Sequence, residues 1–405
     1  MRFVLGIVLA VLAIAPVLTG CGGGGGGGSN VAGAAPGGTL GDQGAGDAPR
    51  VYDQAPAVVF IDFYSDPSPI ASRYGICVVD QGRERIMRAA RSANPAMKPF
   101  LYELVGCTDD QNWPNDPIGS TWITQNHPEW YLTDGSGQII RFTHYPHLMA
   151  LDPGNADYQQ KWADNAIAAA RAVGAEGIYI DNANSRYDWN FAAIPTRYPD
   201  RASFAAAMDS FMRNVAAILH QAGLQVIGNG SGETSTSGMW AEWNQLLDGR
   251  AYEQPPLFAD GSPQEVDRRW KDILDGVQAF PDKIALMFIR QPSVVGQDLY
   301  RYYVASYLAW AGPQTYLGIM QHGSAPTPSD PLRDIRIGSP VEQAHIITGA
   351  VYEREYENGM VYVNTSRTLA ATIEVPAGLT DPEANPIPSG PRVLGAHNAL
   401  VLLKT

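Results

Sequence analysis

The sequence predicts an α/β protein: a (β/α)8 TIM barrel followed by a small antiparallel β domain. Two observations predict this fold. Short β-branched or aromatic runs alternate with longer helical patterns from about residue 58 to residue 352, and after Tyr356 only short strand patterns follow, separated by Gly, Pro and Asn. Alternating strands and helices indicate parallel pairing with right-handed crossovers. Short strands separated by turn residues indicate antiparallel pairing.

The barrel prediction requires eight strands, and the chain offers eight candidates, of which the third is the weakest. The candidates are residues 58–64, 100–105, 148–152, 177–181, 225–229, 249–253, 284–289 and 315–320. Helical periodicity predicts the segments between or after them at residues 82–92, 158–173, 203–221, 240–247, 266–280, 299–311 and 341–351. The β domain is expected to use residues 360–364, 371–375, 392–394 and 399–403. We therefore expect the barrel to span residues 51–352 and the β domain residues 353–405.

The first fifty residues predict a lipid-anchored bacterial envelope protein. A short, positively charged N-terminal region is followed by an almost continuous apolar run and by Leu18-Thr19-Gly20-Cys21, which is similar to a lipobox. Residues 1–21 are thus expected to be a lipoprotein signal peptide, with Cys21 as the lipidated residue. The alternative is an uncleaved transmembrane anchor, because the run approaches the minimum spanning length. Residues 22–50 are rich in glycine and predict a disordered tether, and Gly22 lacks the aspartate associated with inner-membrane retention.

The charge of the chain narrows the class of partner. The formal net charge is −13, with 28 Lys and Arg against 41 Asp and Glu. Binding to nucleic acid requires clustered basic residues, so we expect no nucleic-acid partner. A neutral or cationic ligand suits an acidic, aromatic-rich chain better. No Gly-x-Gly-x-x-Gly lies between a strand and a helix, which argues against a dinucleotide, and no cofactor is expected.

Active sites of TIM barrels lie at the carboxyl ends of the strands, so polar residues there are the first candidates. Carboxylates dominate this set, and two carboxylates flanking one bond are what glycoside hydrolysis requires. We expect Asp181 and Glu253 to be the catalytic pair. The remaining candidates are expected to bind substrate, and they are Asp62, Tyr64, Glu103, Asp152, Asn229 and Arg290.

Each candidate carboxylate also has a structural interpretation. Asp181 follows the apolar run Ile178-Tyr179-Ile180, where an aspartate could instead cap a helix or order a loop. Glu253 could instead pair with Arg250 or Arg290. Glu103 could have a structural role instead of pointing into the barrel. Asp62 and Asp152 could order loops rather than bind substrate.

Aromatic residues crowd the segments expected to lie above the barrel. Flat faces of sugars stack on such rings, so several of them together favour a glycan cleft, and Trp130 is expected to bind substrate. The alternative for each ring is a place in the core. The set comprises Trp113, Trp122, Trp130, Tyr131, Tyr187, Trp189, Trp240 and Trp243.

Neither metal nor thiol chemistry is predicted. His144-x-x-His147 is the one close histidine pair, and it lacks partners at zinc-site spacing, so no metal is expected. Cys77 and Cys107 are expected to follow the first and second strands. They could form a disulfide, which an extracellular location permits, or remain two separate buried thiols.

Several motifs, in their order and spacing, resemble hypothetical glycosyl hydrolase family 15. They are His127-Pro128-Glu129-Trp130-Tyr131-Leu132, Met149-Ala150-Leu151-Asp152-Pro153-Gly154-Asn155 with Tyr158, Gly177-Ile178-Tyr179-Ile180-Asp181-Asn182, Gly228-Asn229-Gly230 and Arg250-Ala251-Tyr252-Glu253. The resemblance covers roughly residues 55–405. It implies a TIM-barrel glycosidase, distantly similar to α-galactosidase-like and polygalactosaminidase barrels.

The resemblance also implies roles for the two carboxylates. Asp181 would be the nucleophile after the fourth strand, and Glu253 the general acid/base after the sixth. Relatives often carry a second aspartate after the nucleophile, where this chain has Asn182.

The leading hypothesis is a monomeric, retaining glycoside hydrolase that cleaves an envelope or extracellular polysaccharide. Retention requires carboxyl groups about 5 Å apart, whereas about 6.5–9.5 Å indicates inversion. The alternative is a non-catalytic glycan-binding lipoprotein with the same barrel cleft, because a fold does not establish a reaction. A polysaccharide deacetylase or lyase is weaker, because metal ligands or a basic catalytic cluster are missing from the sequence.

Overall fold

The computed structural model describes residues 57–60, 74–80, 84–111, 118–230, 238–253, 263–290, 296–320, 332 and 335–405. The candidates Cys21, Asp62, Tyr64 and Trp113 lie outside these residues, as do the predicted signal peptide and tether. Among the helices that the structure describes, none is long and apolar enough to cross a lipid bilayer.

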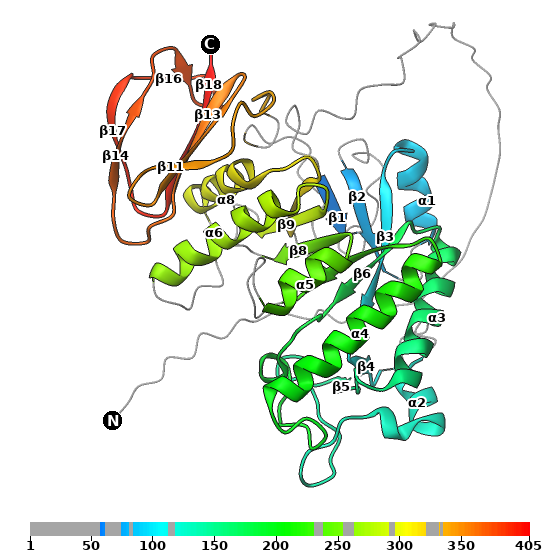
Figure 1. Cartoon of the computed structure of the whole chain (residues 1–405). Helices are drawn as coiled ribbons and strands as arrows, with labels where there is room; N and C mark the ends of the chain where they lie inside the picture. The colour runs from blue at the N-terminus through cyan, green and yellow to red at the C-terminus, as the bar shows by residue number, and fades with distance from the viewer. Residues whose placement is uncertain are drawn as a thin grey trace, which may run out of the picture. The chain divides into compact units, whose positions relative to one another are not determined.

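Eight parallel strands close into a barrel, which confirms the predicted fold class (Figure 1). Neighbours in the ring are joined by parallel pairing in the order β1-β10-β9-β8-β7-β6-β3-β2. The strands are β1 (Ala57–Phe60), β2 (Tyr74–Val79), β3 (Lys98–Leu104), β6 (Gly177–Asp181), β7 (Gln225–Asn229), β8 (Gly249–Glu253), β9 (Ile284–Arg290) and β10 (Thr315–Met320).

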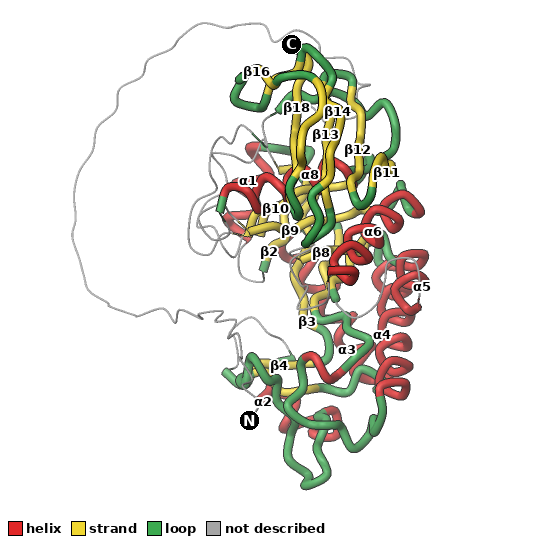
Figure 2. Tube along the Cα trace, turned by 90° about the vertical axis from the view of Figure 1, so that its left-hand side faces the viewer, coloured by secondary structure: helices red, strands yellow, loops and turns green. Residues whose placement is uncertain are grey.

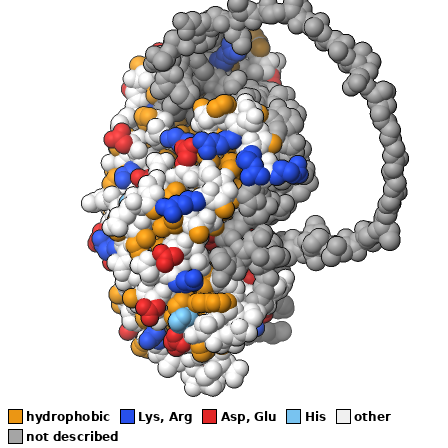
Figure 3. All heavy atoms as spheres, turned by 90° about the vertical axis from the view of Figure 1, so that its right-hand side faces the viewer, with side chains coloured by type: hydrophobic (Ala, Val, Ile, Leu, Met, Phe, Trp, Pro, Cys, Tyr) orange, Lys and Arg blue, Asp and Glu red, His pale blue; other side chains and the backbone are white. Residues whose placement is uncertain are grey.

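Helices connect successive strands, as the periodicity predicts. They are α1 (Glu84–Ala93), α3 (Ala156–Val173), α4 (Arg201–Gln221), α5 (Gly238–Leu246), α6 (Pro263–Ala279) and α8 (Gln297–Trp310). Two of them begin at side-chain caps, because Asn155 accepts from the Tyr158 amide at 3.0 Å and Asp200 from the Ser203 amide at 2.8 Å. On the face shown in Figure 3, basic and acidic side chains are interspersed among apolar ones.

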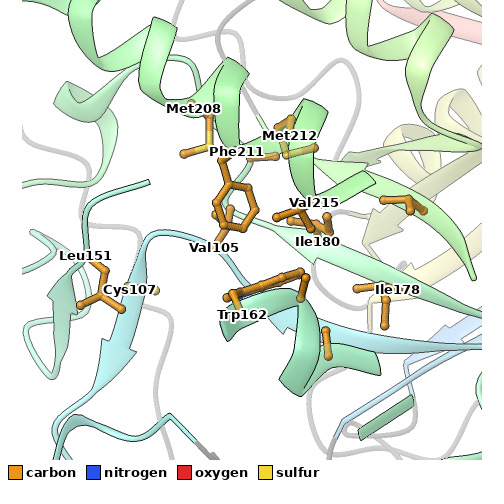
Figure 4. Packing of buried hydrophobic residues seen from close by; sticks show 14 of the residues in the cluster. Val105, Cys107, Leu151, Trp162, Ile178, Ile180, Met208, Phe211, Met212 and Val215 are labelled. Atoms are coloured by element: carbon orange, nitrogen blue, oxygen red, sulfur yellow. The ribbon is translucent and has the colours of Figure 1, made fainter. Parts of the chain in front are cut away.

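Alternation of side chains along the strands divides the apolar residues into two layers. Tyr179 points into the barrel, where it joins a cluster with Ile76, Phe100, Ile227 and Leu286. Its neighbours Ile178 and Ile180 point outward and pack against Trp162 of α3 and against Phe211 and Val215 of α4 (Figure 4). The inward positions at the carboxyl ends of the strands therefore lie directly above an apolar core.

The second and third strands differ from the prediction. Residues 74–79 form β2, and residues 98–104 are therefore the third strand. Residues 148–150, the expected third strand, instead form β5 (Leu148–Ala150), which pairs antiparallel with β4 (Cys107–Asp109) outside the barrel. Gly75 weakens the strand pattern of β2, but a Cβ there would lie 2.7 Å from the ring of Tyr316. Close packing explains the glycine.

Of the two alternatives for the cysteines, the structure has two separate buried thiols rather than a disulfide. Cys77 lies within β2 rather than in a loop after the first strand, and it packs among the outward-facing residues with Met87 and Ala90 of α1. Cys107 lies in β4. Both are free, buried thiols.

The β domain begins earlier than predicted. Residues 341–351 were expected to be helical, but they contain β11 (His345–Thr348), which pairs antiparallel with β12 (Val351–Tyr356). The main sheet has the order β11-β12-β13-β18-β15-β16, and β14 (Ala371–Val375) pairs with β17 (Gly390–Leu394). Figure 2 shows these strands side by side. The remaining members are β13 (Gly359–Asn364), β15 (Leu379–Thr380), β16 (Pro386–Ile387) and β18 (Asn398–Lys404).

A buried arginine connects the β domain to the barrel. Arg354 of β12 donates through Nη1 to the carbonyl oxygens of Leu308, Ala309 and Ala311, at 3.0, 3.2 and 2.7 Å. These carbonyls lie at the end of α8, where the last helical carbonyls have no helical partner and the helix dipole attracts a positive charge.

Candidate active site

Four neighbouring strands each deliver one polar side chain to the same end of the barrel. Tyr102, Asp181, Asn229 and Glu253 each stand two residues after an inward-facing core residue of β3, β6, β7 and β8. Side chains two apart on a strand share a face. The four are therefore directed toward the barrel axis, just above the apolar core.

The amide of Asn229 bridges the two predicted catalytic carboxylates. Its Nδ2 donates to Oδ1 of Asp181 at 2.8 Å and to Oε1 of Glu253 at 3.1 Å. Since both oxygens are hydrogen-bonded to one nitrogen, these two oxygens cannot be farther apart than the two distances together, about 6 Å. The structure thus brings Asp181 and Glu253 together, as the sequence predicts.

Asp181 receives more hydrogen bonds than Glu253. The Tyr102 hydroxyl donates to Oδ2, and the backbone amide of Asn182 donates to Oδ1 at 2.7 Å. Asn182 has a left-handed backbone with φ of 62°, a conformation that asparagine tolerates. Beside it, a Cβ at Gly230 would lie 2.0 Å from the Ala183 carbonyl oxygen, so only glycine fits there. These constraints fix the carboxylate from two sides.

Burial shifts both carboxyl groups toward their neutral forms. The pKa of Asp181 is raised by burial, and this is opposed by the hydrogen bonds from Tyr102, Asn182 and Asn229. The pKa of Glu253 is raised to about 7, first by burial and then by the negative charge of Asp181, with opposition from Asn229 alone. Hydrogen bonds to a carboxylate favour its ionised form. Asp181 is therefore the group that ionises first, and Glu253 retains its proton to near neutrality.

A cavity of about 560 Å³ opens onto the carboxylate pair. Its lining includes Tyr102, Glu103, Asp181, Asn182 and Glu253 from the strand ends. Tyr145, with 41% of its surface exposed, also lines it. The charges of Asp181 and Glu253 contribute to the raised pKa of Tyr145, after burial. Tyr145 is thus an exposed ring beside the site.

Two predicted substrate-binding residues have structural roles instead. Asp152 is 1% exposed and is held by the Arg197 guanidinium, the Tyr198 hydroxyl and the Gly154 amide, which makes it the loop-ordering residue that was the alternative. Trp130 is 1% exposed, and its ring stacks on His127 with centroids 4.2 Å apart. Neither belongs to the cavity lining that the structure describes.

The other predicted aromatic rings are mostly core residues as well, among those whose side chains the structure describes; Trp113 and the side chain of Trp189 lie outside that set. Trp240 and Trp243 are fully buried, and the guanidinium of Arg250 lies 4.1 Å from the Trp240 ring. Arg290 is the last residue of β9, and its side chain lies outside the described part of the chain. Glu103 is at the cavity, one residue from Tyr102, which the prediction omitted. Strand parity from Phe100 was the signal that would have found Tyr102.

Replacing Trp130 with alanine should destabilise the protein rather than weaken sugar binding. Removing a buried tryptophan side chain costs about 3–5 kcal/mol of unfolding free energy. Urea denaturation would measure this loss against Leu369→Ala, because Leu369 is 70% exposed and should change stability by less than about 0.5 kcal/mol. A Trp130→Ala protein of unchanged stability would contradict the core assignment.

Replacing Asn229 with alanine should lower kcat and move the pH profile. Hydrogen bonds to charged groups contribute about 1.5–3 kcal/mol, which corresponds to about 10–150-fold in rate. Since the Asn229 amide lowers the pKa of Glu253, its loss should raise that pKa and shift the alkaline limb of kcat/KM to higher pH. The measurement is kcat/KM against pH beside Asn385→Ala, an exposed asparagine of the β domain. A lower rate with an unmoved alkaline limb would mean that Asn229 does not act on Glu253.

Comparison with known proteins supports the barrel and gives the family. The sequence model of hypothetical glycosyl hydrolase family 15 matches residues 91–360. Among solved structures, an α-amylase from Anoxybacillus superposes with a TM-score of 0.50 at 12% identity, covering 87% of this chain and 98% of that one. An α-galactosidase from Lactobacillus brevis superposes with a TM-score of 0.50 at 11% identity, covering 87% of this chain and 55% of the galactosidase. Comparison with curated proteins finds no match.

Proposed function

Because the chain belongs to hypothetical glycosyl hydrolase family 15, we propose that it is a retaining glycoside hydrolase with Asp181 as nucleophile and Glu253 as acid/base. The observation that supports the proposal is the Asn229 bridge, which holds one oxygen of Asp181 and one oxygen of Glu253 within about 6 Å of each other. A gap for a catalytic water, which inversion needs, is about 6.5 Å or more. The substrate is a carbohydrate polymer of the envelope or the extracellular space.

The reaction follows from the two protonation states. Glu253 gives its proton to the glycosidic oxygen while Asp181 attacks the anomeric carbon, which breaks the glycosidic bond and forms a glycosyl ester. Water then attacks the same carbon from the face opposite Asp181 and loses a proton to Glu253, and the ester bond to Asp181 breaks. The hydroxyl of Tyr102 and the amides of Asn182 and Asn229 orient Asp181 throughout.

The test is reducing-sugar release by the full chain from a panel of neutral, amine-bearing and uronate polysaccharides, with proton NMR of the first anomer formed. We expect release with retained configuration. Inverted product would exclude Asp181 as nucleophile. Polysaccharide binding without release would favour the alternative, a non-catalytic glycan-binding barrel.

The pH dependence should follow Glu253. Its pKa is raised to about 7, and the acid step needs its protonated form. Therefore kcat/KM should fall as the pH rises through about 7, and rise at low pH as Asp181 ionises. Rates measured between about pH 4 and about pH 9 would show this. Full activity retained well above pH 9 would contradict the assignment of Glu253 as the acid.

We also propose that the enzyme is anchored at the bacterial cell envelope through a lipid on Cys21. The support is the lipobox-like sequence that ends at this residue. A labelled fatty acid should be incorporated by the parent chain and not by Cys21→Ser.

We infer that the protein is a monomer, since one chain supplies Tyr102, Asp181, Asn229 and Glu253. Light scattering in detergent would test this.

A further inference from the structure

Asn182, the residue that follows the proposed nucleophile, lines the cavity together with Asp181 and Glu253. It comes directly after β6, where its left-handed backbone turns the chain. The mechanism above uses only the backbone amide of Asn182, which donates to Asp181. The side chain of this partly exposed residue therefore has no assigned role.

Three of the four polar groups of Asn182 have a partner in the fold. The backbone amide donates to Oδ1 of Asp181 at 2.7 Å, and the backbone carbonyl accepts from the amide of Asn184 at 2.7 Å. The side-chain oxygen accepts from Nδ2 of Asn190 at 3.3 Å. An asparagine side chain has one acceptor oxygen and one NH2 donor, so the NH2 group remains. This group has no partner within the described part of the chain.

The surroundings of Asn182 hold its NH2 group in one direction. Asn190 is itself fixed, because its backbone amide donates to the Tyr187 carbonyl at 3.0 Å and its carbonyl accepts from the Thr143 amide at 2.7 Å. Since the side-chain oxygen of Asn182 is directed toward Asn190, the NH2 group is directed away from it. The cavity therefore offers a hydrogen-bond donor beside the nucleophile.

The carboxylate of Asp181 offers no free acceptor to a cation on the substrate. Its Oδ1 accepts from Asn182 and Asn229, and its Oδ2 accepts from Tyr102. The remaining electron density of Oδ2 is needed for attack on the anomeric carbon. A protonated amine has only donors, so beside this carbon it would face occupied acceptors and the NH2 group of Asn182.

The chemistry of the reaction indicates which group of the sugar the NH2 group meets. Two groups are adjacent to the anomeric carbon, the ring oxygen and the substituent on C2. The ring oxygen becomes positively polarised in an oxocarbenium-like transition state, so a donor would oppose that step. An oxygen on C2 can accept, and hydrogen bonds to it strengthen in the transition state. The NH2 group is therefore suited to an oxygen on C2.

We propose that Asn182 is a specificity-determining residue whose side-chain NH2 group donates to an oxygen on C2 of the sugar that Asp181 attacks. The substrate is then a glycan whose cleaved unit carries a hydroxyl or an acylated amine at C2, since both present an acceptor oxygen. A free, protonated amine at C2 is rejected because it offers only donors. This inference rests on the proposed glycosidase function and adds the chemistry of the cleaved sugar.

Binding by a slowly cleaving chain separates this inference from the hydrolase itself. Full-length Glu253→Gln keeps the printed contacts of Asn182 and would be studied by isothermal titration. The ligands are matched oligosaccharides with a hydroxyl, an acetylated amine or a free amine at C2, in the glucose and the galactose series. We expect the hydroxyl or acetylated form of at least one series to bind at least about 10-fold more tightly than the free amine, because one hydrogen bond is gained and one donor conflict is avoided.

Two substitutions change the amide of Asn182 and keep its left-handed backbone. Asn182→Gly, added to Glu253→Gln, removes the NH2 group and should abolish the preference for an oxygen at C2. Asn182→Asp replaces the donor with an acceptor and should favour the free amine instead. Gln138→Glu, which adds the same charge at an exposed position, is the matched control and should leave the preference unchanged. Thermal melting of each variant shows that it is folded.

The rate of the parent chain gives a second readout. With Glu253 intact, Asn182→Gly should lower kcat by about 10-fold or more and change KM by less, because the bond to the C2 oxygen strengthens in the transition state. A change confined to KM would mean that the NH2 group contacts the sugar elsewhere, which would contradict the assignment to C2.

The possible results distinguish the two proposals. Equal or tighter binding of the free-amine oligosaccharides, or a preference that Asn182→Gly leaves unchanged, would overturn the role of Asn182. Binding of none of the oligosaccharides would also overturn it. Hydrolysis by the parent chain in any of these cases would leave the glycosidase intact. A preference for a C2 oxygen that depends on Asn182, in a parent that cleaves none of the panel, would support the inference and reject the hydrolase.

Discussion

Asp181→Asn should reduce glycoside hydrolysis by about 10⁴-fold or more, which is the range seen when a catalytic nucleophile is removed. The amide is nearly isosteric but cannot form the glycosyl ester. The asparagine NH2 group cannot accept a hydrogen bond, so one of the three groups that donate to the Asp181 carboxylate, on Tyr102, Asn182 and Asn229, would lose its acceptor. The measurement is kcat on the best polysaccharide of the panel.

Two comparisons show whether this loss is chemical. Asp164→Asn, an exposed carboxylate on α3, should keep the parent rate. Added azide should restore cleavage by Asp181→Asn, because the anion takes the place of the missing carboxylate and gives a glycosyl azide of inverted configuration. Hydrolysis by Asp181→Asn at a tenth of the parent rate or faster would remove Asp181 from the nucleophile role.

Glu253→Gln should lower kcat by about 10²–10⁴-fold on natural glycosidic bonds, the usual contribution of general acid–base catalysis. A substrate whose leaving group departs without a proton should lose far less in the first step. Because the second step still needs the base, the glycosyl ester on Asp181 should then accumulate. Mass spectrometry of the intact protein would detect the added sugar.

The configuration of the glycosyl azide product distinguishes the roles of the two carboxylates. With Glu253→Gln, azide attacks the glycosyl ester, displaces the Asp181 carboxylate and gives a glycosyl azide of retained configuration, opposite to the result with Asp181→Asn. Glu383→Gln, an exposed glutamate of the β domain, should behave like the parent. Retained azide from Asp181→Asn, or inverted azide from Glu253→Gln, would reverse the roles.

The strands that carry the site could be predicted because burial on both faces leaves a clear pattern. Gly177–Asp181, Gln225–Asn229 and Gly249–Glu253 were predicted with the bounds that the structure shows, since each is a short run ended by a polar residue. Strand β2 was missed because Gly75 and Cys77 interrupt its pattern. The helix expected at residues 341–351 is replaced by β11, where pairing with β12 overrides local helical periodicity.

The site was predicted in part, and the missing residues depend on tertiary structure. Asp181, Asn229 and Glu253 follow from the rule that barrel sites lie at strand ends. Glu103 was predicted and lines the cavity, whereas Tyr102, which also lines it, was omitted because strand parity from Phe100 was not used. Asp152 was expected at the substrate because residues 148–152 were predicted to be a barrel strand, and Trp130 because aromatic rings crowd the segments predicted above the barrel. In the structure Trp130 belongs to the same buried cluster as the outward-facing residues of the barrel strands and of α3 and α4.

The rates at which the two buried thiols react with a labelling reagent report local opening of the fold. Cys77 is fully buried between β2 and α1, and burial raises its pKa to about 12, so the reactive thiolate is scarce in the folded chain. A thiol reagent can therefore modify Cys77 only when α1 separates from the barrel. Cys107 lies at the cavity wall, so its labelling rate should differ from that of Cys77. Comparing the two labelling rates would distinguish opening around the cavity from unfolding of the barrel.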